Sequence, residues 1–274
     1  MDKAFCIGNG TSRLGFDLNK LRGKGTIMGC NAIYRDFKPD VLVCVDNGIM
    51  HEAYQSGIAS EIDFYGRNWT KVPAIHYEMM LYAGLNLNEV NNVKKQWDGL
   101  YENDRGNASE FVMHGSNMAG EVTIMREDKA TYKKNVNQSV CKISWIEEDK
   151  VNDLNSIMPN GIDIGWASGS MSGYVACKTL NPTHVYLIGQ DLVSETDSVN
   201  NMYKGSLYYK VPEAKPVPPN QWIQQWLTLF NDYPDVKFFK VNPKEGKASQ
   251  KLNEWKMCKN LTYIKLSELD EHIK

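Results

Sequence analysis

Three short apolar runs near the amino terminus constrain the fold more than any other feature of this 274-residue sequence. They are residues 3–7, 26–30 and 41–45, and each is followed by polar residues and then by a stretch of helical character. Short buried strands that alternate with helices in this way form βαβ units, and such units build a parallel sheet. The sequence therefore predicts an α/β fold.

A second block with the same pattern spans residues 168–191. A turn of small residues opens a helix, a break at Asn181 and Pro182 ends it, and the apolar run 184–188 leads to Asp191. Backbone N–H groups at a helix start bind anions, and open α/β sheets bind ligands at the carboxyl ends of their strands. We therefore expect an anionic, nucleotide-like ligand at this edge. An ordinary capped helix followed by a loop aspartate is the alternative.

The pattern along the whole chain favours a single α/β domain over residues 1–274: a Rossmann-like, mostly parallel sheet with helices on both faces. Between residues 79 and 159 the pattern weakens, which predicts an inserted subdomain that contains short strands. Residues 192–219 carry four prolines and no strand or helix signal. Long stretches of this kind inside a compact domain are usually functional loops, so we predict a lid and call residues 192–219 the lid segment. An apolar stripe then predicts a helix around residues 222–230.

Composition excludes several classes of protein. The net charge of −2 gives no overall attraction to nucleic acid, and no apolar run reaches the length of about 20 residues that a membrane helix needs. The first residues enter a strand pattern directly, so we expect a cytoplasmic protein without a membrane span. The six cysteines form no CxxC pair and the histidines form no HExxH motif, so no metal ligands are assigned.

Polar or glycine residues follow four of the predicted strands, at the edge where such a sheet builds its site. The first group is Gly8-Asn9-Gly10-Thr11-Ser12, which we call the glycine loop. Its glycines allow the backbone to approach an anion closely, and its hydroxyls can donate to phosphate oxygens. A tight strand–helix turn is the alternative. The other strand ends carry Asn31, Asp46 and Asp191, and Asp46 could equally cap the next helix.

Two sets of residues resemble the bacterial lipooligosaccharide sialyltransferases and the related motility-associated-factor glycosyltransferases. The first set is the glycine loop, with Gly29-Cys30-Asn31-Ala32 and Val45-Asp46. The second set is Ser168-Gly169, Tyr174-Val175-Ala176 and the strand that ends in Gly189-Gln190-Asp191. These families have a GxGxS loop, an asparagine after the second strand, a Ser-Gly turn before a helix, and a strand that ends in Gly-x-Asp.

The resemblance implies a glycosyltransferase that moves a sugar from a nucleotide-sugar to an acceptor hydroxyl. It implies the following donor-nucleotide contacts: Gly8, Asn9, Gly10, Thr11, Ser12, Asn31, Ser168, Gly169, Ser170, and, from the lid segment, Tyr203 and Tyr208. The sialyltransferases use a histidine base after the Gly-x-Asp strand, but only His272 follows Asp191 here. The expected catalytic base is therefore Asp191, Asp46 or His51; a surface position is the alternative for His51.

The sequence leaves the acceptor and two other functions open. The acceptor is a glycan or a hydroxylated base of DNA, as in phage DNA modification, with basic clusters at residues 129–134 and 247–259 as a phosphate track. One alternative is a pterin pyrophosphokinase-like enzyme that uses ATP and a divalent metal held by Asp46 and Asp191. The other is a nucleotide-binding module without catalysis. No cofactor is assigned, and a homo-oligomer is among the assemblies left open.

Overall fold

The computed structural model describes residues 2–46, 49, 52–53, 56, 58–67, 111–114, 121–125, 131–135, 143–146 and 166–274. The chain divides into two compact units. Unit 1 consists of Met1–Val45 and Glu147–Lys274, and unit 2 is Asp46–Ile146. Unit 2 thus interrupts unit 1 in the sequence, with bounds that differ from the 79–159 expected for the insertion.

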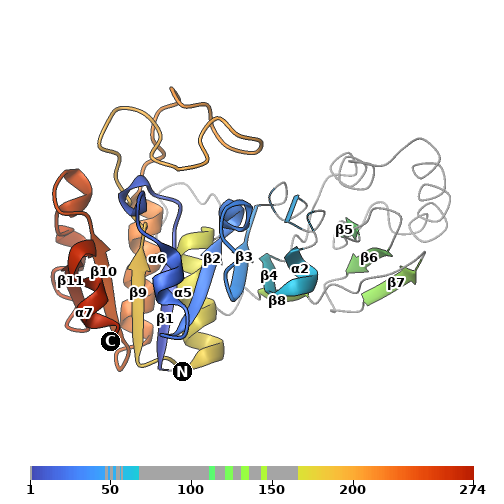
Figure 1. Ribbon diagram of the computed structural model, residues 1–274, viewed down its shortest axis with the longest axis horizontal. Coiled ribbons are helices and arrows are strands. Elements are labelled where there is room, and N and C mark those ends of the chain that lie inside the picture. Colours follow the sequence, from blue (N-terminus) through green and yellow to red (C-terminus); the bar gives the residue numbers. More distant parts are fainter. Residues whose placement is uncertain are drawn as a thin grey trace. The chain divides into compact units, whose positions relative to one another are not determined.

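The sheet of unit 1 is parallel throughout. It contains β1 (Lys3–Ile7), β2 (Thr26–Cys30), β3 (Val41–Cys44), β9 (His184–Ile188), β10 (Lys237–Asn242) and β11 (Leu261–Lys265), in the order β11-β10-β9-β1-β2-β3 (Figure 1). Strands β1 and β9 lie in the middle of this order and are almost fully buried. Burial on both faces explains why these strands read as continuous apolar runs. The predicted α/β fold class is confirmed.

Helices cover both faces of this sheet. Helix α5 (Ser168–Leu180) packs against β1, β2 and β3, and α6 (Asn220–Asp232) packs on α5 and on β10 through Phe230 and Phe238. The neighbouring residue Phe239 contacts His272 of α7 (Leu269–His272). Because successive side chains of a strand point to opposite faces, α6 and α7 lie on different faces of the sheet.

The core beneath α6 is built from large aromatic side chains. Trp226 and Phe230 stack, and Phe230 meets the ring of Trp255 edge-on at 5.1 Å between centroids. Trp255 donates its indole N–H to the carbonyl of Ile223 at 3.0 Å, which satisfies the polar atom of a fully buried ring. Gly173 of α5 leaves the space that the ring of Trp226 occupies. These contacts confirm the apolar stripe expected around residues 222–230.

The remaining elements of unit 1 are short. They are the 3₁₀ helices η1 (Thr11–Arg13), η2 (Leu18–Leu21), η3 (Asn31–Arg35), η6 (Lys247–Ser249), η7 (Asn253–Trp255) and η8 (Leu266–Glu268). In unit 2, α2 (Ile58–Glu61) precedes β4 (Asp63–Arg67), which pairs in parallel with β8 (Ile143–Ile146). Strands β5 (Phe111–His114), β6 (Glu121–Met125) and β7 (Thr131–Asn135) form an antiparallel sheet. The sequence did not indicate β7. The apolar residues within 72–77 predict a further strand, and this segment lies outside the described residues.

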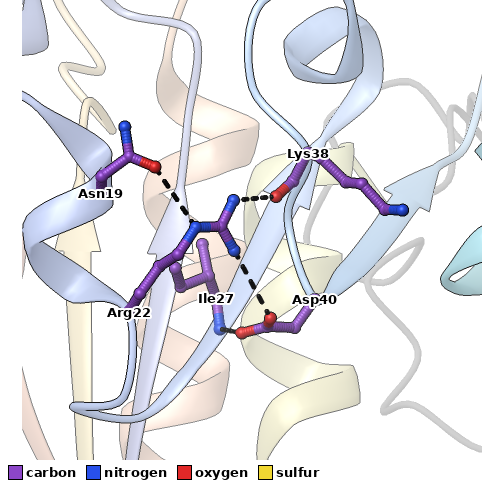
Figure 2. Close-up of polar contacts among 5 residues, drawn as sticks. All are labelled: Asn19, Arg22, Ile27, Lys38 and Asp40. Atoms are coloured by element: carbon purple, nitrogen blue, oxygen red, sulfur yellow. Dashed lines mark hydrogen bonds and ion pairs between the residues drawn. The ribbon is translucent and has the colours of Figure 1, made fainter.

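Arg22 and Asp40 connect the segments that enter β2 and β3, at the amino edge of the sheet (Figure 2). Arg22 bonds the side chain of Asn19 at 3.2 Å and the carbonyl of Lys38 at 2.8 Å. Asp40 accepts the backbone N–H of Ile27 at 2.8 Å, and its other oxygen lies 3.9 Å from Arg22. Both charged groups are about half exposed, so this network adds little stability but fixes where the strands begin. In the described part of the chain, no helix has the length and apolar character needed to cross a bilayer.

Candidate functional site

The glycine loop extends the contact between β1 and β9 beyond the ends of both strands. Gly8 donates its N–H to Ile188 at 2.7 Å, and Gly10 donates to Gly189 at 2.9 Å. A Cβ at Gly8 would lie 2.5 Å from the Gly189 carbonyl, and a Cβ at Gly10 would lie 2.4 Å from the Asp191 carboxylate. Both positions therefore need glycine because of close backbone approach. This contact brings together the two sets of residues that carry the family resemblance.

Asp191 fastens the glycine loop to the lid segment. Its carboxylate accepts the backbone N–H of Ser12 at 2.9 Å, the hydroxyl of Ser12, and the side-chain amide of Asn200 at 2.9 Å. Asn200 in turn accepts the N–H and the hydroxyl of Thr11, at 2.9 and 2.7 Å. Asp191 is buried, so its carboxylate serves as an acceptor for two segments that lie far apart in the sequence.

Asn31 and Ser168 connect β2, β3 and the start of α5. Ser168 donates its hydroxyl to the Asn31 side chain at 2.6 Å and accepts the backbone N–H of Val45 at 3.2 Å. Asn31 has a φ of 50°, in the left-handed region that asparagine tolerates better than most residues. The carboxyl ends of two neighbouring strands are thus held against the first residue of α5.

The next two residues of α5 face different surroundings. Gly169 lies against Gln190, where a Cβ would come within 2.4 Å of the Gln190 amide oxygen. Ser170 is buried between α5 and α6, where its hydroxyl donates to Gln225. Residues two apart in a helix differ in direction by roughly 200°, so Ser168 and Ser170 cannot both face the sheet edge. The structure brings Ser168 and Gly169 to the glycine loop and β2, and places Ser170 in the helix contact.

The lid segment reaches the glycine loop through residues 202–209. Met202 donates its N–H to the Asn9 carbonyl at 2.8 Å, and Tyr203 is buried. The hydroxyl of Tyr209 accepts from the Ala32 N–H at 3.3 Å and from the Asn9 amide at 3.5 Å. Tyr208, which the sequence analysis named, is 51% exposed and has a φ of 66°. Of these two neighbouring tyrosines, Tyr209 and not Tyr208 therefore contacts the glycine loop.

Arg35 of η3 holds the outer part of the lid segment. It donates to the Ser206 hydroxyl at 2.7 Å and to the Leu207 carbonyl at 3.2 Å. Its guanidinium also lies over the rings of Tyr203 and Tyr209, at 5.8 and 5.7 Å from their centroids. Cation–π contacts of this kind add to the hydrogen bonds. The start of the lid segment is fixed separately, because Glu195 accepts the N–H groups of Lys247 and Ala248 at 2.7 and 2.8 Å.

Four buried side-chain polar atoms in the described part of the chain have no hydrogen-bond partner, and all four belong to this region. They are Asn9 Oδ1, Arg13 Nη2, Gln190 Nε2 and Tyr203 Oη. Buried polar groups are nearly always paired, so a cluster of unpaired ones indicates atoms that await a partner. Each of these residues is in the glycine loop, directly after it, next to Asp191 or in the lid segment. These unpaired atoms make this sheet edge a candidate site for a polar ligand.

The other two candidate bases cannot be added to this site. Asp46 is exposed and belongs to unit 2. His51 lies outside the described residues. No group of three or more metal-binding side chains occurs among the described residues.

Lys240 is a buried cation that the sequence analysis did not consider. It lies on the same face of β10 as Phe238, is 2% exposed, and donates to the Asn242 side chain at 2.9 Å. Burial lowers the pKa of Lys240 to about 8, against the opposing effect of the Asp191 carboxylate. The positive charge of Lys240 therefore attracts the carboxylate of Asp191. Asp191 is the residue that links the glycine loop and the lid segment.

We expect Lys240→Met to change the pH dependence of stability. The pKa of Lys240 is about 8 in the folded protein against an ordinary 10.5, so between these values the unfolded chain binds more protons. The free energy of unfolding then rises with pH across that window, by on the order of 2 kcal/mol. Below it, the folded state carries the cost of burying the ammonium. Urea denaturation from about pH 7 to about pH 10 should show this rise in the wild type and lose it in Lys240→Met. Parallel profiles for the two proteins would contradict it.

Comparison with known proteins adds no relative. No family model, no curated protein and no solved structure matches the chain. We therefore infer the function from the residues and contacts described above.

Proposed function

We propose that this chain is a glycosyltransferase that moves a sugar from a nucleotide-sugar donor to an acceptor hydroxyl. The observation that carries the proposal is the meeting of the glycine loop, Asn31, Ser168 and the lid segment at one edge of a parallel sheet. The unpaired polar atoms at the same edge support it, because a nucleotide-sugar offers both donors and acceptors. The resemblance of both sets of residues to the two glycosyltransferase families supports the choice of reaction.

In this proposal, the chain stabilises the leaving nucleotide phosphate through backbone and side-chain donors. The glycine loop offers close backbone approach, and its side chains offer hydroxyl and amide groups. Asn31 and Ser168 form one wall, and Tyr203 and Tyr209 form the cover. The lid segment would exclude water, which otherwise competes with the acceptor hydroxyl for the sugar.

The proposed base that removes the acceptor proton is Asp191, Asp46 or His51. Of these, only Asp191 belongs to the sheet edge of unit 1, and its carboxylate already accepts from Ser12 and Asn200. The acceptor is proposed to be a glycan hydroxyl or a hydroxylated base of DNA. Retention on duplex DNA that falls with rising salt would favour DNA, and absence of retention at low salt would favour a glycan.

A thermal-shift panel with CMP-, UDP- and GDP-sugars and ATP, each with and without Mg²⁺, tests the proposal. We expect one class of nucleotide-sugar to raise the melting temperature, because a ligand that binds only the folded state stabilises it. Release of the free nucleotide on addition of acceptor would then establish transfer. Stabilisation by ATP and Mg²⁺ alone would replace the proposal with a pyrophosphokinase. Binding without any transfer would leave a nucleotide-binding module.

A further inference from the structure

Arg13 is a buried arginine directly after the glycine loop. It is 6% exposed, and its Nε donates to the carbonyl of Gly8 at 2.7 Å. Its methylene groups pass beside Gly189, where a Cβ would lie 2.9 Å from Cδ, and the φ of Gly189 is 65°. The fold thus reserves space for this side chain at the carboxyl ends of β1 and β9.

Among the residues that the structure describes, none forms an ion pair with the guanidinium of Arg13. The ion pairs among the described residues are Lys20–Asp270 and Arg22–Asp40, and neither includes Arg13. Its Nη2 is buried without a hydrogen-bond partner. Arginine stays charged at every physiological pH, and a buried charge without a partner destabilises a folded protein strongly. A bound anion would offset this cost.

The side chains around Arg13 are rich in donors. Burial raises the pKa of Tyr203 to about 12, an effect that Asp36 increases and Arg13 reduces, so the phenol keeps its proton at neutral pH. This phenol has no partner within hydrogen-bond geometry, although Asp36 and Arg13 are near enough to affect its pKa. Gln190 adds an unpaired amide N–H group. Of the four unpaired groups, those of Arg13, Tyr203 and Gln190 can donate, and only Asn9 Oδ1 is an acceptor. An excess of donors favours binding of an anion.

We propose that Arg13 binds an oxyanion of the ligand beneath the lid segment, beside Tyr203. This oxyanion is a phosphate or a carboxylate group. A guanidinium presents parallel N–H groups that match two oxygens of either anion. Arg13 lies outside the GxGxS pattern, so this role belongs to the chain's own sequence. This inference rests on the proposed function only for the identity of the anion. The anion would be a phosphate if it belongs to the nucleotide, and a carboxylate if it belongs to an acidic sugar.

Isothermal titration of the full chain with inorganic pyrophosphate and, separately, with N-acetylneuraminate tests the proposal. We expect the wild type to bind one of these probes and Arg13→Gln to bind it at least about tenfold more weakly, because charge-assisted hydrogen bonds are lost. Arg13→Lys keeps the positive charge but lacks the parallel N–H groups of the guanidinium, so its affinity should lie between those of the wild type and Arg13→Gln. Arg22→Gln, at the amino edge of the sheet, is the matched control and should bind like the wild type (Figure 2).

Equal binding by Arg13→Gln, or no binding of either probe by the wild type, would overturn the proposal. If the Arg13 variants do not fold, Tyr203→Phe decides, because it removes a neighbouring hydroxyl and leaves the charge. An unchanged affinity in Tyr203→Phe would then count against the site. Anion binding that depends on Arg13 would support this proposal even if the protein consumes no nucleotide-sugar. Sugar transfer with an unchanged donor KM in Arg13→Gln would leave the glycosyltransferase proposal intact and remove this one.

Discussion

Gly10→Ala is expected to lower donor affinity at least about tenfold and to cost about 2 kcal/mol of folding stability. The added methyl group would lie 2.4 Å from the Asp191 carboxylate and 2.6 Å from the Gly189 carbonyl. The Gly189 carbonyl belongs to the backbone and cannot move without a large cost in free energy. The glycine loop must therefore shift away from the end of β9, and Ser12 would shift with it. Urea denaturation gives the stability change, and titration with the nucleotide-sugar selected by the thermal-shift panel gives the affinity.

Gly15→Ala is the matched control for Gly10→Ala. Gly15 has a φ of 81° and no atom within 4 Å of an added Cβ. Its substitution costs about 1–2 kcal/mol of backbone strain but creates no clash. Donor affinity should therefore persist in Gly15→Ala. An equal loss of affinity in both variants would show that lowered stability, and not the loop position, weakens binding.

Asp191→Ala is expected to loosen the contact between the lid segment and the glycine loop and to destabilise the protein by about 3 kcal/mol. The substitution leaves the N–H and hydroxyl of Ser12 without their acceptor and removes one of the two acceptors of the Asn200 amide, which keeps the Val193 carbonyl. It also leaves the buried Lys240 without the negative charge that acts on it. Urea denaturation measures the cost, and limited proteolysis within residues 192–219 measures the release of the lid segment.

Asp191→Asn and Asn200→Ala together distinguish a linking role of Asp191 from a catalytic one. Asn200 has no acidic group that could serve as a base. If Asp191 acts by linking, Asn200→Ala should therefore also speed proteolysis of the lid segment, and both substitutions should raise the donor KM. An amide at position 191 would direct N–H groups at another donor and should have a similar effect. Loss of kcat in Asp191→Asn, with stability and donor KM unchanged, would instead identify Asp191 as the base.

The sheet of unit 1 was predictable because four of its strands, β1, β2, β3 and β9, are almost fully buried. Residues 3–7, 26–30, 41–45 and 184–188 are short apolar runs bounded by polar or glycine residues, and each became a strand. The glycine loop and Asp191 were predictable as neighbours, because parallel strands bring their carboxyl ends to one edge. In unit 2, the short strands expected in the inserted region include the apolar runs that form β5 and β6, but β7 has mostly polar residues and carries no strand signal in the sequence.

The site residues that sequence reasoning missed depend on local direction and on burial. A left-handed φ at Tyr208 accompanies the exposure of that residue, while Tyr209 contacts Asn9, and nothing in Tyr208-Tyr209 signals this difference. Ser170 was grouped with Ser168, although the helical turn separates them. Arg13 and Lys240 read as ordinary surface cations in the sequence. Only the tertiary structure shows that both are enclosed.

The pairing of β1 has a consequence for synthesis of the chain. Ala4 pairs with Thr26 on one side and with Val185 on the other. As the chain emerges from the ribosome, β1 can therefore complete one edge early, while its other edge stays unpaired until β9 has been made. Long-range pairings of this kind slow folding, and an unpaired apolar strand is prone to associate with other chains. Fragments that stop before β9 should aggregate, and chaperones that shield nascent chains should raise the yield of the complete protein.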